Sequence, residues 1–302
     1  FQSTYLGLFP HGKGPYGKGM GINMENIMII VPHEDDEVLM AGGIIERAVK
    51  NGKKVTVVIA TNGDYEGTDM ETGSIRLPET AAGLAVLGLP LENIIFMGYA
   101  DTGMNGEESF LYSLYYEKEE SRIHKGHCSD VTYGMKNKPD FHSEYYGRAG
   151  EYTRKNFKED LRTIFMLNKP DTIFTTSLED IHGDHSGLYL FVLEVLKEEK
   201  ANGYVPVLYS GVVHSKAGDH IWPERSEEMV PFSCPPGFDK GSLKWEDRVS
   251  FPVPESMRSM ELDRNKKAEA LSKHVHALKE DAVEYLYAFI KADEVFWEIK
   301  EK

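Results

Sequence analysis

The chain has 302 residues, of which 41% are hydrophobic and 27% charged, with a formal net charge of -15. This length and composition are typical of a globular protein, with either one large domain or two small ones. The negative charge argues against a nucleic-acid binder, because phosphate contacts need clustered lysine and arginine. No apolar run approaches the roughly 20 residues that would cross a membrane.

The two cysteines, Cys128 and Cys234, lie far apart and lack the spacing of a metal or redox motif. We therefore expect free thiols in a reducing compartment and a cytoplasmic location. The chain starts with Phe1-Gln2-Ser3 rather than Met, and we interpret these residues as the remnant of a cleaved tag. A removed signal peptide remains an alternative. The pattern leaves the oligomeric state open.

The first hundred residues alternate short apolar runs with amphipathic stretches. Residues 4–21, rich in glycine and aromatic residues, are expected to form a loop or arm. Buried strands are predicted at 26–31, 54–60 and 93–97, with helices at 38–50 and 75–87 between them. This order predicts a mainly parallel sheet with right-handed crossovers.

The alternation resumes later in the chain and predicts one α/β domain over residues 1–302. The predicted elements are helices at 153–168 and 186–201, strands at 171–175 and 207–213, and a long helical region at about 255–290. Two long insertions, at about 102–150 and 214–254, interrupt the pattern and are expected to serve function or to carry small elements of their own.

The insertions contain many aromatic side chains, which could either stack against sugar rings or form small cores. A His-x-x-His-Cys run at 124–128 could also suggest a second metal site, but a polar loop with ordinary histidines is the favoured interpretation. The aromatic residues concerned are Tyr112, Tyr115, Tyr116, Tyr133, Tyr145, Tyr146, Trp222 and Trp245.

Charged residues follow two of the predicted strands directly. The first strand ends in a His and four acidic residues at 33–37, and a second His/Asp cluster follows the fourth strand at 177–185. Ligands bind at the carboxyl ends of parallel strands, and carboxylates this close together repel unless a cation neutralises them. Two imidazoles and one carboxylate with open positions form the ligand set of a catalytic zinc site.

Five short motifs, in order, resemble those of the PIG-L/LmbE-like deacetylases. This family includes N-acetylglucosaminyl-phosphatidylinositol, mycothiol-pathway and bacillithiol-pathway deacetylases. VPHEDDE (31–37) resembles the family's (A/P)HPDDE, and HGDH (182–185) resembles its HPDH. The other matches are IRLPE (75–79) to R-x-x-E, GYAD (98–101) to G-(Y/F)-x-D, and KAEALSKH (267–274) to K-x-x-A-L-x-x-H. The resemblance covers about residues 24–213 and the last predicted helix.

The resemblance implies a fold and a chemistry. The fold would be a Rossmann-like three-layer α/β sandwich with a mainly parallel sheet, two long insertions and a C-terminal helix. The activity would be zinc-dependent hydrolysis of an N-acyl amide, with an N-acetylglucosamine-type sugar or glycoconjugate as the expected substrate. Another divalent ion such as Fe²⁺ remains an alternative, because occupancy follows availability as well as ligand type.

The resemblance also implies residue roles. Zinc would be bound by His33, Asp36 and His185. Asp35 would be the general base that activates the metal-bound water. His182 would steady the oxyanion and protonate the leaving amine. Asp184 would orient His182, and the substrate would be contacted by Arg76 and Asp101.

The sequence departs from the family pattern at Glu34 and Gly183, where the family has proline, and in its two insertions. Neither single position would supply a ligand, but the insertions leave the substrate open. There are two alternatives to a sugar deacetylase. The protein could be a metal-dependent amidase that acts on a non-sugar N-acyl substrate, or a carbohydrate-binding relative without catalytic activity. Two other functions are disfavoured. A phosphoacceptor receiver domain would leave the histidines without a role. A non-haem iron oxygenase could use two histidines and a carboxylate, but such enzymes are associated with all-β barrels rather than with an α/β pattern.

Overall fold

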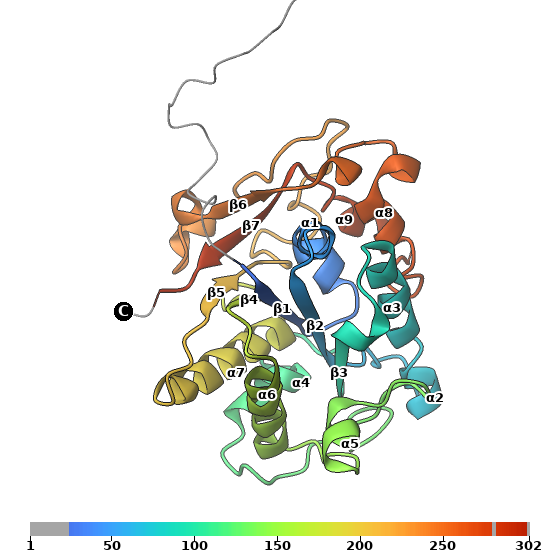
Figure 1. The fold of residues 1–302 in the computed structure, drawn as a ribbon, viewed down its shortest axis with the longest axis vertical. Helices are drawn as coiled ribbons and strands as arrows, with labels where there is room; N and C mark the ends of the chain where they lie inside the picture. The colour runs from blue at the N-terminus through green and yellow to red at the C-terminus, as the bar shows by residue number, and fades with distance from the viewer. Residues whose placement is uncertain (1–23, 280–281, 301–302) are drawn as a thin grey trace, which may run out of the picture.

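In the computed structural model, which describes residues 24–279 and 282–300, a seven-stranded sheet has the order β3-β2-β1-β4-β5-β7-β6 (Figure 1). The five strands from β3 to β5 are parallel, whereas β7 pairs antiparallel with both β5 and β6. The strands are β1 (Asn26–Val31), β2 (Lys54–Thr61), β3 (Ile94–Tyr99), β4 (Thr172–Thr175), β5 (Val207–Ser210), β6 (Val249–Pro252) and β7 (Asp293–Glu298).

Helices cover both faces of this sheet. One face carries α1, α3 and α8, and the other carries α4, α6 and α7 (Figure 1). The helices are α1 (Asp36–Lys50), α2 (Met70–Gly73), α3 (Leu77–Val86), α4 (Phe110–Tyr116), α5 (Phe141–Tyr146), α6 (Arg154–Asn168), α7 (Gly183–Lys200), α8 (Lys266–Leu271) and α9 (Val283–Tyr287).

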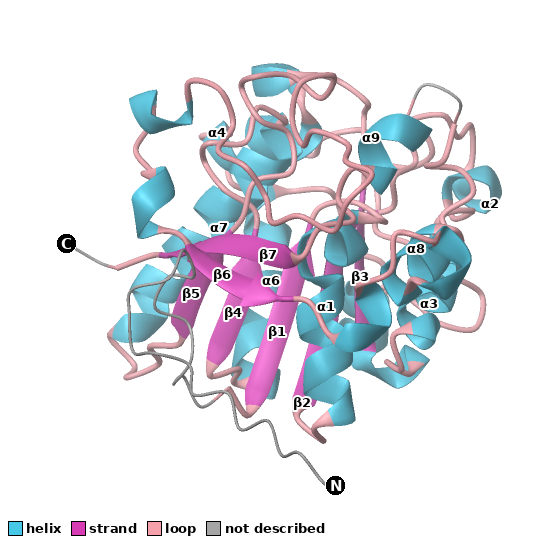
Figure 2. Cartoon of the chain, turned by 90° about the horizontal axis from the view of Figure 1, so that it is seen from above, coloured by secondary structure: helices cyan, strands magenta, loops and turns pink. Residues whose placement is uncertain are grey.

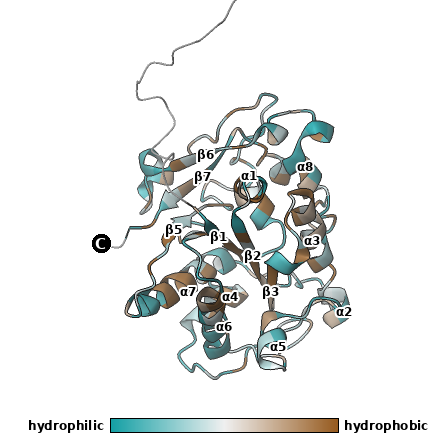
Figure 3. Ribbon diagram, viewed as in Figure 1, coloured by the Kyte–Doolittle hydropathy of each residue, from teal (hydrophilic) through white to brown (hydrophobic). Residues whose placement is uncertain are grey.

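The central strands are buried on both faces, as apolar runs of this kind predict. Ile27 and Ile29 of β1 face the core beneath α1, while Met28 and Ile30 face the core beneath α6 and α7. Hydropathy colouring shows the same concentration of apolar residues along the central strands (Figure 3). Loops gather beyond one end of the parallel strands, where their carboxyl ends lie (Figure 2).

The predicted fold class is confirmed, and the elements predicted up to residue 213 are present with shifts at their ends. The predicted long helical region at 255–290 is wrong. This region contains two short 3₁₀ helices, Glu255–Met257 and Leu262–Arg264, followed by α8 and α9. The described part of the chain then continues into β7 rather than ending in a helix.

The two insertions contain elements of their own. The first holds α4 and α5, and the second holds β6 at the edge of the sheet. The predicted arm at 4–21 and the tag remnant at 1–3 lie outside the described residues. Within the described residues, no helix is long and apolar enough to cross a membrane.

Candidate metal centre and its pocket

The chain leaves β1 through a sharp turn that carries three of the predicted site residues. His33, Asp35 and Asp36 are 7%, 8% and 2% exposed, respectively. Asp35 is the N-cap of α1 and has a φ of 113°, a conformation that non-glycine residues rarely adopt. Such strain occurs mainly at functional sites, where the surroundings hold the residue in place.

The second cluster lies where the β4–α7 connection enters α7. His182 is the N-cap of α7, and Asp184 and His185 belong to its first turn. His185 is fully buried, whereas His182 is half-buried and lines the pocket. The rings of His33, His182 and His185 have centroids 4.7 to 5.3 Å apart. The two clusters therefore meet at one edge of the sheet.

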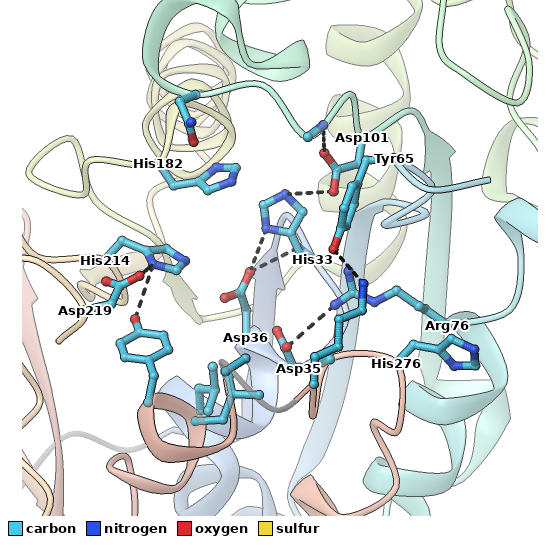
Figure 4. Close-up of a pocket in the computed structure, with 18 residues that line it drawn as sticks. His33, Asp35, Asp36, Tyr65, Arg76, Asp101, His182, His214, Asp219 and His276 are labelled. Atoms are coloured by element: carbon cyan, nitrogen blue, oxygen red, sulfur yellow. Dashed lines mark hydrogen bonds and ion pairs between the residues drawn. The ribbon is translucent and has the colours of Figure 1, made fainter. Parts of the chain in front are cut away.

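One carboxylate oxygen lies next to both predicted histidine ligands. Oδ2 of Asp36 is 3.4 Å from Nδ1 of His33 and 3.3 Å from Nε2 of His185. Figure 4 shows the ring of His33 between Asp36 and Asp101. The structure thus brings the three expected ligands together, with one nitrogen of each imidazole directed at the same carboxylate.

The opposite nitrogen of each imidazole lies beside a different buried carboxylate. Nε2 of His33 is 3.2 Å from Oδ2 of Asp184. Nδ1 of His185 is 3.0 Å from Oδ2 of Asp180, an ion pair rather than an aligned hydrogen bond. The side chain of Asp184 bonds to His33 and to the backbone N–H of Leu111, whereas its contact with His182 runs through its backbone N–H.

These carboxylates control the charge of the imidazoles. Burial opposes protonation, but Asp101 and the other neighbouring carboxylates raise the pKa of His33 well above its usual value. Burial likewise opposes protonation of His185, but Asp180 and Asp36 raise its pKa to about 10. Burial alone would raise the pKa of Asp36, but the neighbouring His185 holds it well below its usual value. A metal cation bound here would take the place of these imidazole protons.

His182 has a different electrostatic environment. Burial, together with the nearby His33 and His185, lowers the pKa of His182 to about 3. The backbone N–H of Asp184 donates to its Nδ1 at 3.3 Å. The ring is therefore neutral with its proton on Nε2, which makes it a hydrogen-bond donor on the pocket wall.

Arg76, the N-cap of α3, contacts the turn between β1 and α1 at both Glu34 and Asp35. It donates from Nη2 to the carbonyl oxygen of Glu34 at 2.5 Å and lies 3.6 Å from Oδ2 of Asp35. The side chain of Glu34 is completely buried, and its Oε2 lies 3.6 Å from Nε of Arg76. Burial raises the pKa of Asp35 to about 6, although Arg76 opposes the shift.

Asp101, the other predicted substrate contact, also lies at the site. Its Oδ2 is 3.8 Å from Nε2 of His33, and its Oδ1 accepts from the N–H of Gly103 at 2.8 Å. Asp64 holds this turn by accepting from the N–H of Asp101 at 2.7 Å and from the hydroxyl of Tyr133 at 2.6 Å. All eight predicted site residues therefore lie around one cluster.

The cluster opens into a pocket of about 590 Å³, and some of the residues that line it were not predicted from the sequence. His214 follows β5 and completes the histidine group, with its ring 5.4 Å from His182 and 5.1 Å from His185. Asp219 lies 3.0 Å from Nδ1 of His214. The position of His214 at the same edge of the sheet could have revealed it. Other lining residues are Tyr65, Asn105, His276, Lys279 and Tyr285.

The aromatic residues of the insertions do not form a wall of the pocket, and only some of them contribute to small cores. None of these eight tyrosines and tryptophans lines the pocket, and Tyr133 and Trp222 are buried, whereas Tyr116, Tyr145 and Tyr146 are exposed. The histidines at 124 and 127 do not converge: His124 pairs with Glu117, and His127 contacts the carbonyl oxygen of Thr102.

Two groups of described side chains bring three possible ligand atoms within 4.8 Å of one another. One comprises His33, His182 and His185, and the other comprises His33, Asp101 and Asp184. Asp36 adds an oxygen beside His33 and His185. The cluster is therefore a candidate metal centre with His33 at its middle.

The family model described as "PIG-L: GlcNAc-PI de-N-acetylase" matches residues 28–196, more than half of the chain. The chain belongs to the PIG-L family. The match includes both turns that carry the histidine and aspartate clusters. Among curated protein sequences, none matches this chain.

Several solved structures with a similar fold cover nearly the whole chain at low identity. N,N'-diacetylchitobiose deacetylase from Pyrococcus horikoshii matches with a TM-score of 0.53 and 16% identity, over 92% of this chain and 84% of that one. The A40926 pseudoaglycone deacetylase Dbv21 has a TM-score of 0.52 and 17% identity, over 91% and 97%. The hydratase GalB from Pseudomonas putida has a TM-score of 0.50 and 14% identity, over 92% and 98%. These likenesses concern the fold alone.

Proposed function

We propose that this PIG-L family protein is a zinc-dependent N-deacetylase that acts on an N-acetylated amino sugar or glycoconjugate. The observation that carries the proposal is the position of Oδ2 of Asp36, 3.4 Å from Nδ1 of His33 and 3.3 Å from Nε2 of His185. One nitrogen of each imidazole thus lies beside the same carboxylate oxygen, and His33 and Asp36 also line the pocket.

The donor set fits a zinc ion. Nε2 of His185 is buried and has no hydrogen-bond partner, so it is available as a ligand atom. His33 and Asp36 both line the pocket, which leaves room for water and substrate beside the three ligands. A bound divalent ion would make water more acidic and polarise the amide carbonyl.

The protein side chains would carry the proton transfers and orient the substrate. Asp35 lies next to Asp36 on the pocket wall and would take the proton from the attacking water. The neutral ring of His182 would donate a hydrogen bond to the carbonyl oxygen as negative charge develops there. Arg76 would hold Asp35 in place from the opposite side.

The amino-sugar part of the proposal is supported by the polar wall of the pocket. Asp101, Asn105 and Asp219 line it and offer oxygen acceptors for sugar hydroxyls. Tyr65, which is 38% exposed, presents an aromatic ring to the same space. The names of several structural neighbours, including the chitobiose deacetylase, agree with this substrate class.

A hydratase is the second candidate, because GalB, named a 4-carboxy-2-hydroxymuconate hydratase, has the same fold. A substrate with several carboxylates needs cations that are available to pair with it. Arg76 already lies 3.6 Å from oxygens of both Glu34 and Asp35, and Lys279 is paired with Glu66. This arrangement favours a substrate without negative charge.

The experiment that tests the proposal is acetate release from a panel of N-acetylated sugars, glycosides and non-sugar amides, with zinc and with chelator. Zinc-dependent release that the chelator abolishes is expected, with sugars as the best substrates. Release from non-sugar amides alone would overturn the sugar assignment. No release from any member by the zinc-loaded protein, together with hydration of an unsaturated carboxylate, would overturn the deacetylase assignment.

A further inference from the structure

The carboxylate of Asp180 is buried in the β4–α7 connection, where it contacts three separate parts of the site. Its Oδ2 accepts from the backbone N–H groups of Val213 and His214, at 2.8 and 3.0 Å. The same oxygen lies 3.0 Å from Nδ1 of His185. Its Oδ1 accepts from the backbone N–H of His182 at 3.0 Å. One side chain thus joins the exit of β5 to both histidines of the second cluster.

We propose that Asp180 is a positioning residue that fixes which nitrogen of His185 is presented to the metal. This inference rests on the proposed zinc site. Nδ1 of His185 lies beside Asp180, and the remaining nitrogen, Nε2, is the one beside Asp36. A carboxylate behind a histidine ligand fixes the tautomer and ring orientation and makes the imidazole more basic.

Asp184 has the matching position behind the other imidazole. Its Oδ2 lies 3.2 Å from Nε2 of His33, which leaves Nδ1 of His33 directed at Asp36. The two imidazoles therefore present opposite nitrogens to the same point, and each is held from behind by its own carboxylate. Because both imidazoles contact Oδ2 of Asp36 and their ring centroids are 5.3 Å apart, the effects of the two pairs on zinc binding should be coupled.

Asn is the most informative substitution at position 180, because its side chain has the shape of Asp but replaces one acceptor oxygen with an NH₂ group. Both oxygens of Asp180 face N–H groups, so an amide placed in either orientation directs an NH₂ group at a donor. Asp180→Asn should thus weaken the hold on His185 without opening a cavity. Glu179→Gln is the control, because Glu179 pairs with Lys216 and Ser242 outside the histidine cluster.

The test is zinc affinity, measured by chelator competition on the full chain, together with the thermal midpoint of the metal-free protein. We expect Asp180→Asn to weaken zinc binding by roughly 10- to 100-fold, and Glu179→Gln to leave it unchanged. Asp184→Asn should also weaken zinc binding, through His33. Unchanged zinc affinity in Asp180→Asn, even with a lower midpoint, would make its role merely structural and overturn the inference.

A second measurement uses the wild-type protein and therefore does not depend on whether a variant folds. In the zinc-loaded wild-type protein, ¹⁵N NMR should show His185 protonated at Nδ1 and metal-bound at Nε2. The reverse assignment would overturn the inference while leaving the zinc site intact. Failure of the wild-type protein to bind zinc is a different result, which would overturn the proposed function and with it the role of Asp180.

Discussion

The Nζ atom of Lys267 in α8 lies 3.0 Å from Oε1 of Glu294 in β7, and both side chains are 1% exposed. Both side chains also form hydrogen bonds with the backbone of α1. Lys267 donates to the carbonyl oxygen of Leu39, and Glu294 accepts from the N–H groups of Gly43 and Ile44. A buried ion pair thus connects the C-terminal part of the chain to the helix that begins at the candidate metal site.

Replacing Lys267 with Met should destabilise the fold strongly, because Glu294 would remain as an uncompensated buried charge. Breaking a buried pair in this way costs about 3 to 5 kcal/mol. The measurement is the free energy of unfolding from urea titration. Lys266→Met is the control, because Lys266 is partly exposed and its partner Glu46 keeps Lys50 at 2.7 Å. An equal decrease in the free energy of unfolding in the two variants would contradict the stabilising role of the buried Lys267–Glu294 pair.

His274 should make the fold sensitive to acid. It is 1% exposed, and burial lowers its pKa to about 3 in the folded state, against 6.5 for an ordinary histidine. Between these values the unfolded chain binds a proton that the folded chain does not, so stability falls as the pH drops below 6.5. The contribution is about 1.4 kcal/mol per pH unit in this range.

His274→Gln should therefore flatten the dependence of stability on pH. Urea unfolding at about pH 7 and at about pH 5 would show it, with a difference between variant and wild type on the order of 2 kcal/mol. The exposed His220→Gln is the control and should leave the slope unchanged. An identical slope in His274→Gln would show that His274 does not resist protonation in the folded state.

The parallel half of the fold could be predicted because its strands are buried on both faces and appear in the sequence as unbroken apolar runs. β7 could not be predicted in this way, because its first two residues are Asp293 and Glu294 and only three apolar residues follow them. Asp293 accepts from the hydroxyl of Ser250 and the N–H of Phe232, and Glu294 pairs with Lys267. These partners are distant in sequence, so local periodicity gave no sign that the two acids would be buried.

The residues of the candidate site could be predicted where they directly follow strands. His33 lies in the turn after β1, and His185 lies at the start of α7, after the connection that follows β4. His214 directly follows the predicted strand at 207–213, so the same rule would have identified it. The partner of Asp184 could not be predicted, because it depends on how α7 faces the turn after β1. Tyr285 reaches the pocket from the C-terminal region, which no local pattern links to the site.

Asp35→Asn should retain zinc and lose most of the turnover. Asn tolerates the positive φ of this position, so the turn should keep its shape, but the amide cannot accept a proton. General-base loss lowers kcat by about 10²- to 10⁴-fold. Acetate release and metal content would be measured together, with the exposed Asp263→Asn as the control. Wild-type turnover in Asp35→Asn would remove Asp35 from the mechanism.

His185→Ala should abolish zinc binding, because it removes an imidazole nitrogen that lies 3.3 Å from Oδ2 of Asp36. Loss of a buried side chain also destabilises a fold, so the comparison needs a buried histidine outside the site. His142 provides it: the side chain is buried and contacts Asp160 at 2.8 Å, away from the candidate ligands. Metal analysis after chelation and reconstitution should find zinc in His142→Ala and none in His185→Ala. Full zinc occupancy in His185→Ala would exclude His185 as a ligand and move the metal toward His33, Asp101 and Asp184.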